Sequence, residues 1–443
     1  MRAALSIMIR RFVRDRRGNI AVIFALACVP LITVVGCAVD YSRATQMRSK
    51  LQAAADAASV GAVAKASPAF AAAGTMTSDG AIPVGVTDAS NIFNANVANL
   101  TGYTLDSLTS TVVKNGSTVT STVAFSGSIN TMFLGVIGKT ALTASGTSTA
   151  TASMPLYVDF YLLLDNSPSM GVAATPADVS KMVNNTSDKC AFACHDYNDA
   201  NNYYNLAKTL GVTTRIDVLR SATQSLMDTA AASETYSNQF RMAIYDFGAS
   251  SKTIGLRALF SLSASLSSAK TAAGGIDLMG VYGNNDSYTA DKDTQFSTVF
   301  PAINSAITAP GAGTSSAPMK YLFFVSDGVA DEYNTGCSKP LVSGGRCQSP
   351  IDASLCTTIK NRGIKIAVLY TTYLQLPTNS WYMTYIDPFN KGPFGPSPNS
   401  QIAQNMQSCA SPGLYFEVSP TQGISDAMNA LFRKAVADAR ISG

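Results

Sequence analysis

The sequence predicts an α/β fold in its C-terminal part, a doubly wound and mostly parallel sheet, preceded by a membrane-crossing helix and a small α+β region. Three observations predict it. From about residue 156, short runs rich in Val, Ile, Leu and aromatic residues alternate with helical patterns. Such continuous apolar runs are typical of strands buried on both faces. Near the N-terminus a basic cluster precedes a long uncharged stretch. Between this stretch and residue 156, β-branched and polar residues alternate.

The elements of the C-terminal part, residues 153–443, follow from these patterns. The predicted strands are 156–164, 240–247, 320–326, 363–370 and 414–418. The predicted helices are 215–232, 297–307, 351–362, 402–408 and 424–439. Three stretches fit neither pattern, about 171–212, 331–350 and 374–400, and we expect them to be surface insertions at the rim of the sheet.

The N-terminus predicts a single membrane crossing. Six arginines lie within residues 1–17, and the stretch Ile20 to Val39 carries no charge. At about 1.5 Å per residue this stretch matches the hydrocarbon thickness of a bilayer. A cleaved signal peptide is the competing interpretation, but its apolar region would be shorter and would end at a small-residue cleavage site. Because basic residues stay in the cytoplasm, 1–18 is expected to be a cytoplasmic arm and 19–39 the transmembrane helix.

Residues 40–152 are expected to continue this helix to about residue 66 and then to form a small α+β unit. Apolar or small residues recur at helical spacing from Met47 to Ala62. The stretch 68–90 is expected to be a loop, and 107–113 and 118–125 are expected to be strands joined by a turn at 114–116. A short helix at 129–136 and a last strand at 140–150 complete the unit.

The chain has eight cysteines, and two of them, Cys28 and Cys37, lie in the membrane helix too far apart to bridge each other. The other six form an even set outside the cytoplasm, where disulfides are the default. We expect Cys190–Cys194 to be a local bridge and the other four, Cys337, Cys347, Cys356 and Cys409, to link loops of the C-terminal domain in an undetermined pairing. A zinc site using the adjacent His195 with Asp188 or Asp196, or a haem attachment, is less consistent with the spacing.

A group of oxygen-bearing residues predicts a metal site. Asp165-x-Ser167-x-Ser169 follows the first strand, Asp327 follows the third, and Thr294 lies just before a helix. Ligands bind at the carboxyl ends of strands in such sheets. Two carboxylates and three hydroxyls suit Mg²⁺ best, with Mn²⁺ or Ca²⁺ as alternatives, rather than zinc or copper. The alternative is that Asp165 and the serines only cap a helix.

This order of residues resembles the metal-ion-dependent adhesion site of von Willebrand factor type A domains, over roughly 156–440. Most inner ligands would be neutral, which favours a further carboxylate from a protein partner. The resemblance therefore implies adhesion and not catalysis.

The N-terminal region is similar to TadG-like proteins of tight-adherence (Flp) pilus systems. The similarity lies in Arg17-Gly18-Asn19-Ile20-Ala21-Val22-Ile23-Phe24, in Val39-Asp40-Tyr41-Ser42-Arg43 and in Leu51-Gln52-Ala53-Ala54-Ala55-Asp56. In that family a pilin-like membrane helix precedes a periplasmic von Willebrand type A region. Related minor pilins carry a glutamate five residues after the processed glycine, but Ile23 stands there, which argues against cleavage.

Together these features predict a non-enzymatic inner-membrane protein, with the bulk of the chain periplasmic, that binds a protein partner among the pilus-assembly components. Outside the arginine cluster the charges balance, so no nucleic-acid partner is expected. Two alternatives stay open. One is a surface adhesin for host or matrix ligands, and the other is a metal-dependent hydrolase, although no general base is visible near the two aspartates.

Overall fold

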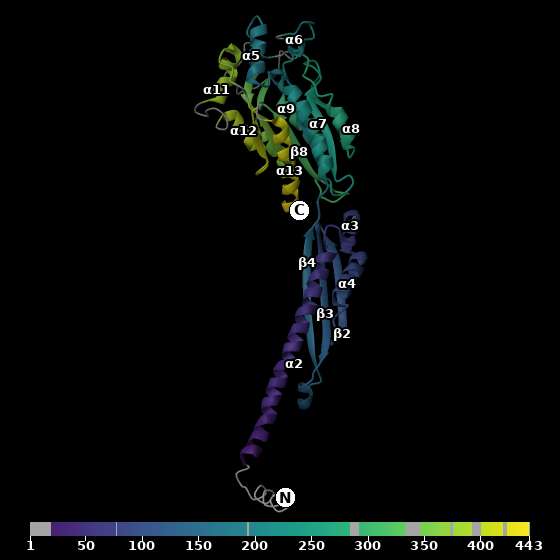
Figure 1. The fold of residues 1–443 in the computed structure, drawn as a ribbon. Helices are drawn as coiled ribbons and strands as arrows, with labels where there is room; N and C mark the ends of the chain where they lie inside the picture. The colour runs from purple at the N-terminus through teal and green to yellow at the C-terminus, as the bar shows by residue number, and fades with distance from the viewer. Residues whose placement is uncertain are drawn as a thin grey trace, which may run out of the picture. The chain divides into compact units, whose positions relative to one another are not determined.

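The computed structural model describes residues 19–76, 78–192, 195–283, 292–333, 346–372, 375–391, 400–419 and 423–442. The chain divides into two compact units, Met1–Met154 and Pro155–Gly443, and each is described by itself (Figure 1).

The first unit is built on one long helix, α2 (Asn19–Ala62). Its segment Val22–Ala62 is long and apolar enough to cross a membrane, which fits a single-pass anchor. Large apolar side chains in its N-terminal part, such as Phe24, are exposed, whereas residues from Leu51 onward pack against the sheet of the same unit. In Figure 1 the N-terminal part of α2 extends past that sheet.

The sheet of the first unit is antiparallel, in the order β1 (Gly80–Ala81), β2 (Thr104–Asn115), β3 (Thr118–Asn130) and β4 (Ala141–Ser153). The hairpin of β2 and β3 has the predicted turn, in which Gly116 adopts a positive φ.

Two local predictions in this unit are wrong. The expected loop 68–90 contains helix α3 (Pro68–Thr75) and the start of α4 (Pro83–Val97). Helix α3 forms because the Ser67 hydroxyl accepts a hydrogen bond from the Phe70 amide and proline occupies a first-turn position. The expected helix 129–136 is reduced to a 3₁₀ turn, η2 (Leu134–Ile137), because β3 continues through Ile129, whose side chain is buried.

The second unit contains a mixed six-stranded sheet in the order β12 (Tyr415–Val418), β11 (Lys365–Thr371), β8 (Met319–Ser326), β5 (Val158–Leu164), β6 (Phe240–Gly248) and β7 (Ile254–Ser263). The first five in this order are the predicted strands, and they run parallel. Strand β7 was not predicted, and it pairs antiparallel to β6. Its residues are mostly half-buried, as is typical of an edge strand.

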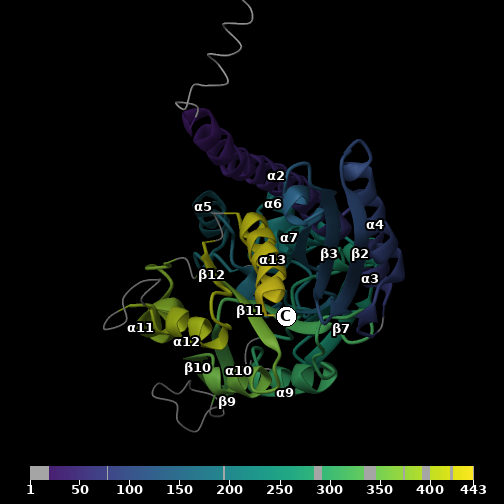
Figure 2. The same cartoon turned by 90° about the horizontal axis from the view of Figure 1, so that it is seen from below.

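Helices cover both faces of this sheet. One face carries α6 (Tyr203–Leu210), α7 (Arg215–Ser233), α8 (Leu266–Ala273) and α13 (Ile424–Ser442). Helix α5 (Pro176–Asn185) contributes side chains to the cores on both faces. The other face carries α9 (Phe296–Ala306), α10 (Ala353–Lys360) and α12 (Gln401–Cys409), and Figure 2 shows α7 and α13 on the opposite side of β11 from α9 and α10. Along β5, Phe160 and Leu162 face the first group whereas Tyr161 and Leu163 face the second. Every residue of β5 is therefore buried.

The predicted insertions are more ordered than expected. The stretch 171–212 contains α5 and α6, and the side chains of Met182 and Tyr204 from these helices are buried in the core. The stretch 331–350 contains parts of an antiparallel pair, β9 (Val329–Tyr333) and β10 (Arg346–Pro350), while 334–345 lies outside the described residues. The stretch 374–400 contains a π-helical turn, η4 (Tyr382–Ile386), and α11 (Asp387–Asn390), while 374 and 392–399 lie outside the described residues.

The cysteines follow the sequence prediction in part. Cys356 and Cys409 form a disulfide that joins α10 to α12, with their Cα atoms 5.0 Å apart. Cys347 is also disulfide-bonded, as expected for the group of four. Cys190 carries a free thiol, so the predicted bridge to Cys194, which lies outside the described residues, is wrong in this structure.

Candidate metal centre

The candidate site lies at the carboxyl ends of the two central strands. Strands β5 and β8 are hydrogen-bonded neighbours. After β5 the chain continues to β6 and β7 on one side of β5, and it then crosses to β8, β11 and β12 on the other side. The strand order therefore reverses between β5 and β8, and ligands of open α/β sheets bind at such a reversal. Asp165 follows β5 directly and Asp327 follows β8 directly, which places both carboxylates at this point.

The loop after β5 is folded by its own side chains. The Asp165 carboxylate accepts a hydrogen bond from the Ser167 amide at 2.9 Å, a turn that short polar side chains favour. The hydroxyls of Ser167 and Ser169 lie 3.1 Å apart. Asn166, between Asp165 and Ser167, is fully buried, and its side chain donates to the Gly248 carbonyl and accepts from the Phe247 amide. Asn166 thereby holds the loop against the end of β6.

The loop after β8 is joined to the first loop by Ser326. Its hydroxyl donates to Asp165 Oδ2 at 2.6 Å and accepts from the Gly328 amide at 2.9 Å. Gly328 has a φ of +75°, and a Cβ there would lie 2.6 Å from Met406 Cγ. Only glycine fits this turn without strain. The turn places Asp327 on the same side of the sheet edge as Asp165.

The electrostatics of the site are dominated by buried charge. The side chains of Asp165 and Asp327 have no solvent exposure. Burial, together with the neighbouring Asp327 carboxylate, raises the pKa of Asp165 to about 7. Two buried carboxylates this close repel each other, and a cation between them would relieve both the repulsion and the loss of hydration.

One cation of the protein already contacts the pair. Arg215 is the first residue of α7, and its side chain is completely buried. Its Nη1 lies 3.7 Å from Asp327 Oδ2, and its Nη2 donates to the Thr372 carbonyl at 2.7 Å. Helix α7 begins at this position because Thr214 and Asp217 form a capping box. Asp327 thus has a positive partner before any metal binds.

Pairwise contacts link four of the five predicted ligands: Asp165 to Ser167, Ser167 to Ser169, and Asp165 to Asp327 through electrostatic repulsion. Thr294 is buried, its backbone carbonyl accepts from the Asp331 amide in β9, and within the described part of the chain no hydrogen bond joins its hydroxyl to the other four. The capping alternative finds no support, because Ser167 precedes the η3 turn (Pro168–Gly171) without a capping hydrogen bond from its side chain. Two carboxylates and neutral hydroxyls are a donor set that fits a hard divalent cation.

The alternative zinc site has no such support. Within the described ranges no group of three or more His, Cys, Asp or Glu side chains could hold a metal. His195 instead lies against the rings of Tyr197 and Tyr204, with its Nδ1 3.2 Å from the Leu278 carbonyl.

Sequence reasoning missed three residues that shape the site: Asn166, Ser326 and Arg215. The sequence could have indicated Asn166 and Ser326, because each is a polar residue beside a predicted ligand at the end of a buried strand. No sequence pattern indicates Arg215, because an arginine near the start of a helix usually lies at the surface, and only the tertiary fold buries this one.

The comparisons with known proteins agree with the N-terminal resemblance. Residues 18–66 match the Tad family, described as "Putative Flp pilus-assembly TadE/G-like". No curated protein matches the chain.

Several solved structures are similar to parts of the chain at low identity. They include the vWF domain of the type V pili tip protein Mfa5 from Porphyromonas gingivalis (11% identity, 66% of this chain and 97% of that chain, TM-score 0.34). They also include the PilB minor pilin from Streptococcus sanguinis (11% identity, 76% and 78%, TM-score 0.34). A third is the proximal thread matrix protein 1 of the mussel byssus with a zinc-occupied MIDAS motif (13% identity, 64% and 46%, TM-score 0.29).

Proposed function

We propose, from the premise that residues 18–66 match the TadE/G-like family of Flp pilus assembly, that this chain is a non-enzymatic, inner-membrane-anchored protein of the tight-adherence pilus system. Its N-terminal arm, residues 1–18, is cytoplasmic, whereas the part of the first unit that follows the membrane-crossing segment and the whole second unit are periplasmic. The arginine cluster before the apolar part of α2 supports this orientation. The second unit binds a protein partner through a divalent cation.

The second unit is proposed to be a doubly wound von Willebrand factor type A domain. Its five parallel strands, the reversal of strand order between β5 and β8, and helices on both faces support this assignment. The order Asp165-x-Ser167-x-Ser169 and then Asp327 supports it independently, because these residues fall at the sheet edge where such domains bind their cation.

The observation that carries the proposal is the pair of fully buried aspartates at the ends of two neighbouring strands, where Asp165 accepts a hydrogen bond from Ser326, the residue before Asp327. Asp165, Ser167, Ser169 and Asp327 would hold the cation, with Thr294 as a fifth candidate. Mg²⁺ is the expected ion, with Mn²⁺ or Ca²⁺ as alternatives. When bound, the cation would supply a Lewis-acidic position for a carboxylate of the partner protein. Ser326 and Asn166 keep the ligand loops in place for this contact.

Substitution of Asp165 by alanine tests the metal site. We expect the full chain in detergent to lose Mg²⁺ and Mn²⁺ binding by calorimetry and to lose chelator-sensitive partner capture in a crosslinking pull-down from membranes. Asp228→Ala is the matched control, because Asp228 is an exposed aspartate that pairs with Lys270 at the surface. The double variant S167A/S169A keeps both carboxylates and is expected to weaken metal binding without unfolding the domain. Unchanged binding in D165A and in S167A/S169A would overturn the mechanism.

The two alternatives predict different results. A surface adhesin would be cut by protease added to intact cells, whereas the proposed protein is protected until the outer membrane is opened. A metal-dependent hydrolase would turn over a panel of phosphate and peptide substrates, and turnover that D165A abolishes would revive that alternative.

A further inference from the structure

The end of the β3–β4 hairpin in the first unit carries several exposed apolar side chains. This hairpin tip comprises residues 131–139, and it exposes Met132 by 69%, Val136 by 80% and Ile137 by 62%. Elsewhere on the sheet of this unit an exposed large apolar residue such as Val113 is isolated. A cluster of exposed apolar residues, unlike scattered single ones, indicates a binding surface.

The tip is a folded turn. The Thr131 amide donates to the Thr140 carbonyl at 3.0 Å, and the Lys139 amide donates to the Leu134 carbonyl at 3.1 Å. The Thr131 hydroxyl also donates to the Lys139 carbonyl at 2.6 Å. Because the backbone is held in this way, the apolar side chains stay displayed and do not fold back onto the sheet.

Helix α2 fixes the position of the tip. The Asp40 carboxylate accepts hydrogen bonds from the amides of Met132, Phe133 and Leu134 at 2.9, 2.8 and 2.9 Å. The Asp40 side chain is 1% exposed, so these three charge-assisted bonds replace its hydration. Phe133 lies directly on Gly36, where an added Cβ would come within 2.5 Å of the Phe133 Cβ.

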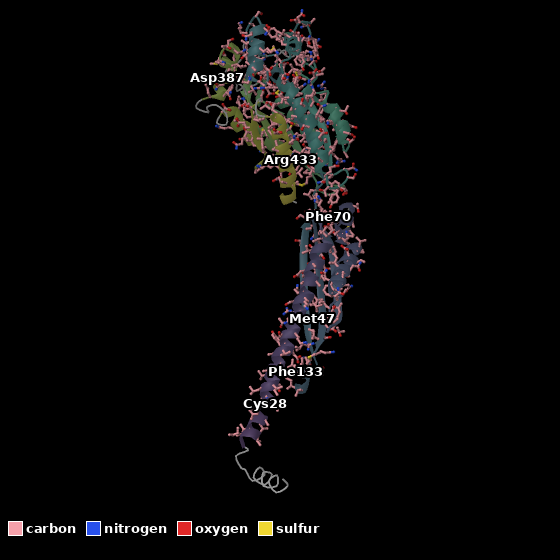
Figure 3. The ribbon with its side chains drawn as sticks, viewed as in Figure 1. Cys28, Met47, Phe70, Phe133, Asp387 and Arg433 are labelled. Atoms are coloured by element: carbon pink, nitrogen blue, oxygen red, sulfur yellow. A yellow bond between two sulfur atoms is a disulfide. The ribbon has the colours of Figure 1, made fainter. Side chains whose placement is uncertain are left out.

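These contacts place the tip at the outer end of the membrane-crossing segment. Asp40 is the first charged residue after the uncharged stretch that ends at Val39. Gly36 lies about 4.5 Å further along the helix axis toward the bilayer centre than Val39. In Figure 3, Phe133 lies beside α2 between Cys28 and Met47. The apolar tip and the exposed apolar part of α2 therefore form one continuous surface.

We propose that the hairpin tip inserts into the outer interface of the same bilayer that α2 crosses, so that the protein contacts the membrane at a second point. The depth reached by Phe133 matches that of apolar residues at the boundary between headgroups and acyl chains. The exposed Lys139 and the partly exposed Arg43 beside the tip are placed to meet lipid phosphates. Two attachment points prevent the first unit from tilting or rotating freely about α2.

The occupant of this surface is lipid and not a second copy of the chain, because the surface is continuous with the lipid-facing part of α2 and lies at the level of the bilayer boundary. The inference rests on α2 being the membrane anchor, as proposed above. It does not depend on the metal site.

Depth-dependent fluorescence quenching in vesicles tests the inference. The full chain carries one tryptophan, Trp381, which is replaced by phenylalanine so that each variant has a single introduced tryptophan. Val136→Trp probes the tip, and Val113→Trp, at an exposed position of β2 opposite Ala81 of β1, is the matched control. Phe24→Trp probes the anchor itself. The vesicles contain phosphatidylglycerol and phosphatidylethanolamine with acyl chains brominated either near the headgroup or near the chain end.

We expect the Val136→Trp emission to be quenched by bromines near the headgroup at least about twofold more than the Val113→Trp emission. Quenching of Phe24→Trp with none for Val136→Trp would overturn the inference while leaving the anchor intact. Absence of quenching in Phe24→Trp would overturn the anchor and the inference together. A third outcome is that the Val136→Trp emission shifts in wavelength as the protein-to-lipid ratio rises and is not quenched by bromines. This result would show that a second copy of the chain covers the tip, and it would also overturn the inference.

Discussion

Removal of the Arg215 charge should destabilise the metal-free second unit and make its stability depend on a divalent cation. The guanidinium lies 3.7 Å from the Asp327 carboxylate with both side chains fully buried. At an effective dielectric constant of about 20 their attraction is about 4 kcal/mol. Breaking a buried pair by removing one partner costs about 3 to 5 kcal/mol, because the remaining charge is left uncompensated. We therefore expect Arg215→Met to lose about that much unfolding free energy in chelator.

Magnesium should restore much of this loss. In Arg215→Met, a cation held by Asp165 and Asp327 would neutralise the unpaired Asp327 carboxylate. The cation would also bind without repulsion from the guanidinium, which the variant lacks. Each tenfold gain in affinity adds about 1.4 kcal/mol of stabilisation at saturating metal. The Mg²⁺-induced gain in unfolding free energy should therefore be larger in Arg215→Met than in the wild type.

Urea unfolding of the full chain in detergent measures both quantities, with and without Mg²⁺. The fluorescence of Trp381 reports the second unit specifically, because its ring lies against Arg346 and Tyr385 there. Arg220→Met is the control: Arg220 is on the same helix and pairs with Asp217 and Asp277, but it is partly exposed. Its loss should be about 1 kcal/mol and independent of metal. An equal loss for Arg215→Met with and without Mg²⁺ would refute the placement of a cation at Asp327.

Three further outcomes are expected. The double variant C356A/C409A removes a disulfide that closes a 53-residue separation and should lose about 4 kcal/mol of unfolding free energy by urea titration in the absence of reductant. Wild-type protein in reductant should lose at least as much, because reductant also breaks the disulfide of Cys347. Ser326→Ala should weaken Mg²⁺ binding by about 10-fold or more in calorimetry, because Asp165 loses an orienting hydrogen bond. Unchanged affinity would mean that the loop after β5 keeps Asp165 in position without Ser326. Gly36→Leu should displace Phe133 and reduce lipid quenching of a tryptophan at position 136, while quenching at position 24 stays unchanged.

The architecture is largely predictable from the sequence where buried strands are continuous apolar runs. The run Leu162-Leu163-Leu164 is typical of a strand covered on both faces, and it lies at the centre of the sheet. Strand β7 escapes prediction because its residues are half-buried and carry no periodic signal. Helix α3 escapes because an alanine-rich run beside glycine and threonine has the composition of a loop, and its helix depends on one cap at Ser67.

The site is predictable for a different reason. Residues directly after buried parallel strands lie at one edge of the sheet, so Asp165 and Asp327 are expected at the same edge. That β5 and β8 are neighbours there is set by the sheet order, which the order along the chain does not give. Thr294 follows a long segment whose path no local pattern fixes, so its place relative to the carboxylates cannot be derived in the same way. Its backbone pairs with Asp331 of β9, a contact that the sequence does not indicate.

Arg215 changes what the site means physically. A pair of buried carboxylates without a counter-charge would bind a cation as a condition of folding. Because the guanidinium already pairs with Asp327, we expect the second unit to fold without a cation, and a cation at the proposed site would have to tolerate this positive charge. On the proposed function, partner capture would then depend on the concentration of divalent cation outside the cytoplasm, because folding of the second unit would not require the ion. The Arg215→Met variant tests this distinction, because it removes the counter-charge and leaves a pair of buried carboxylates that would need a cation for folding.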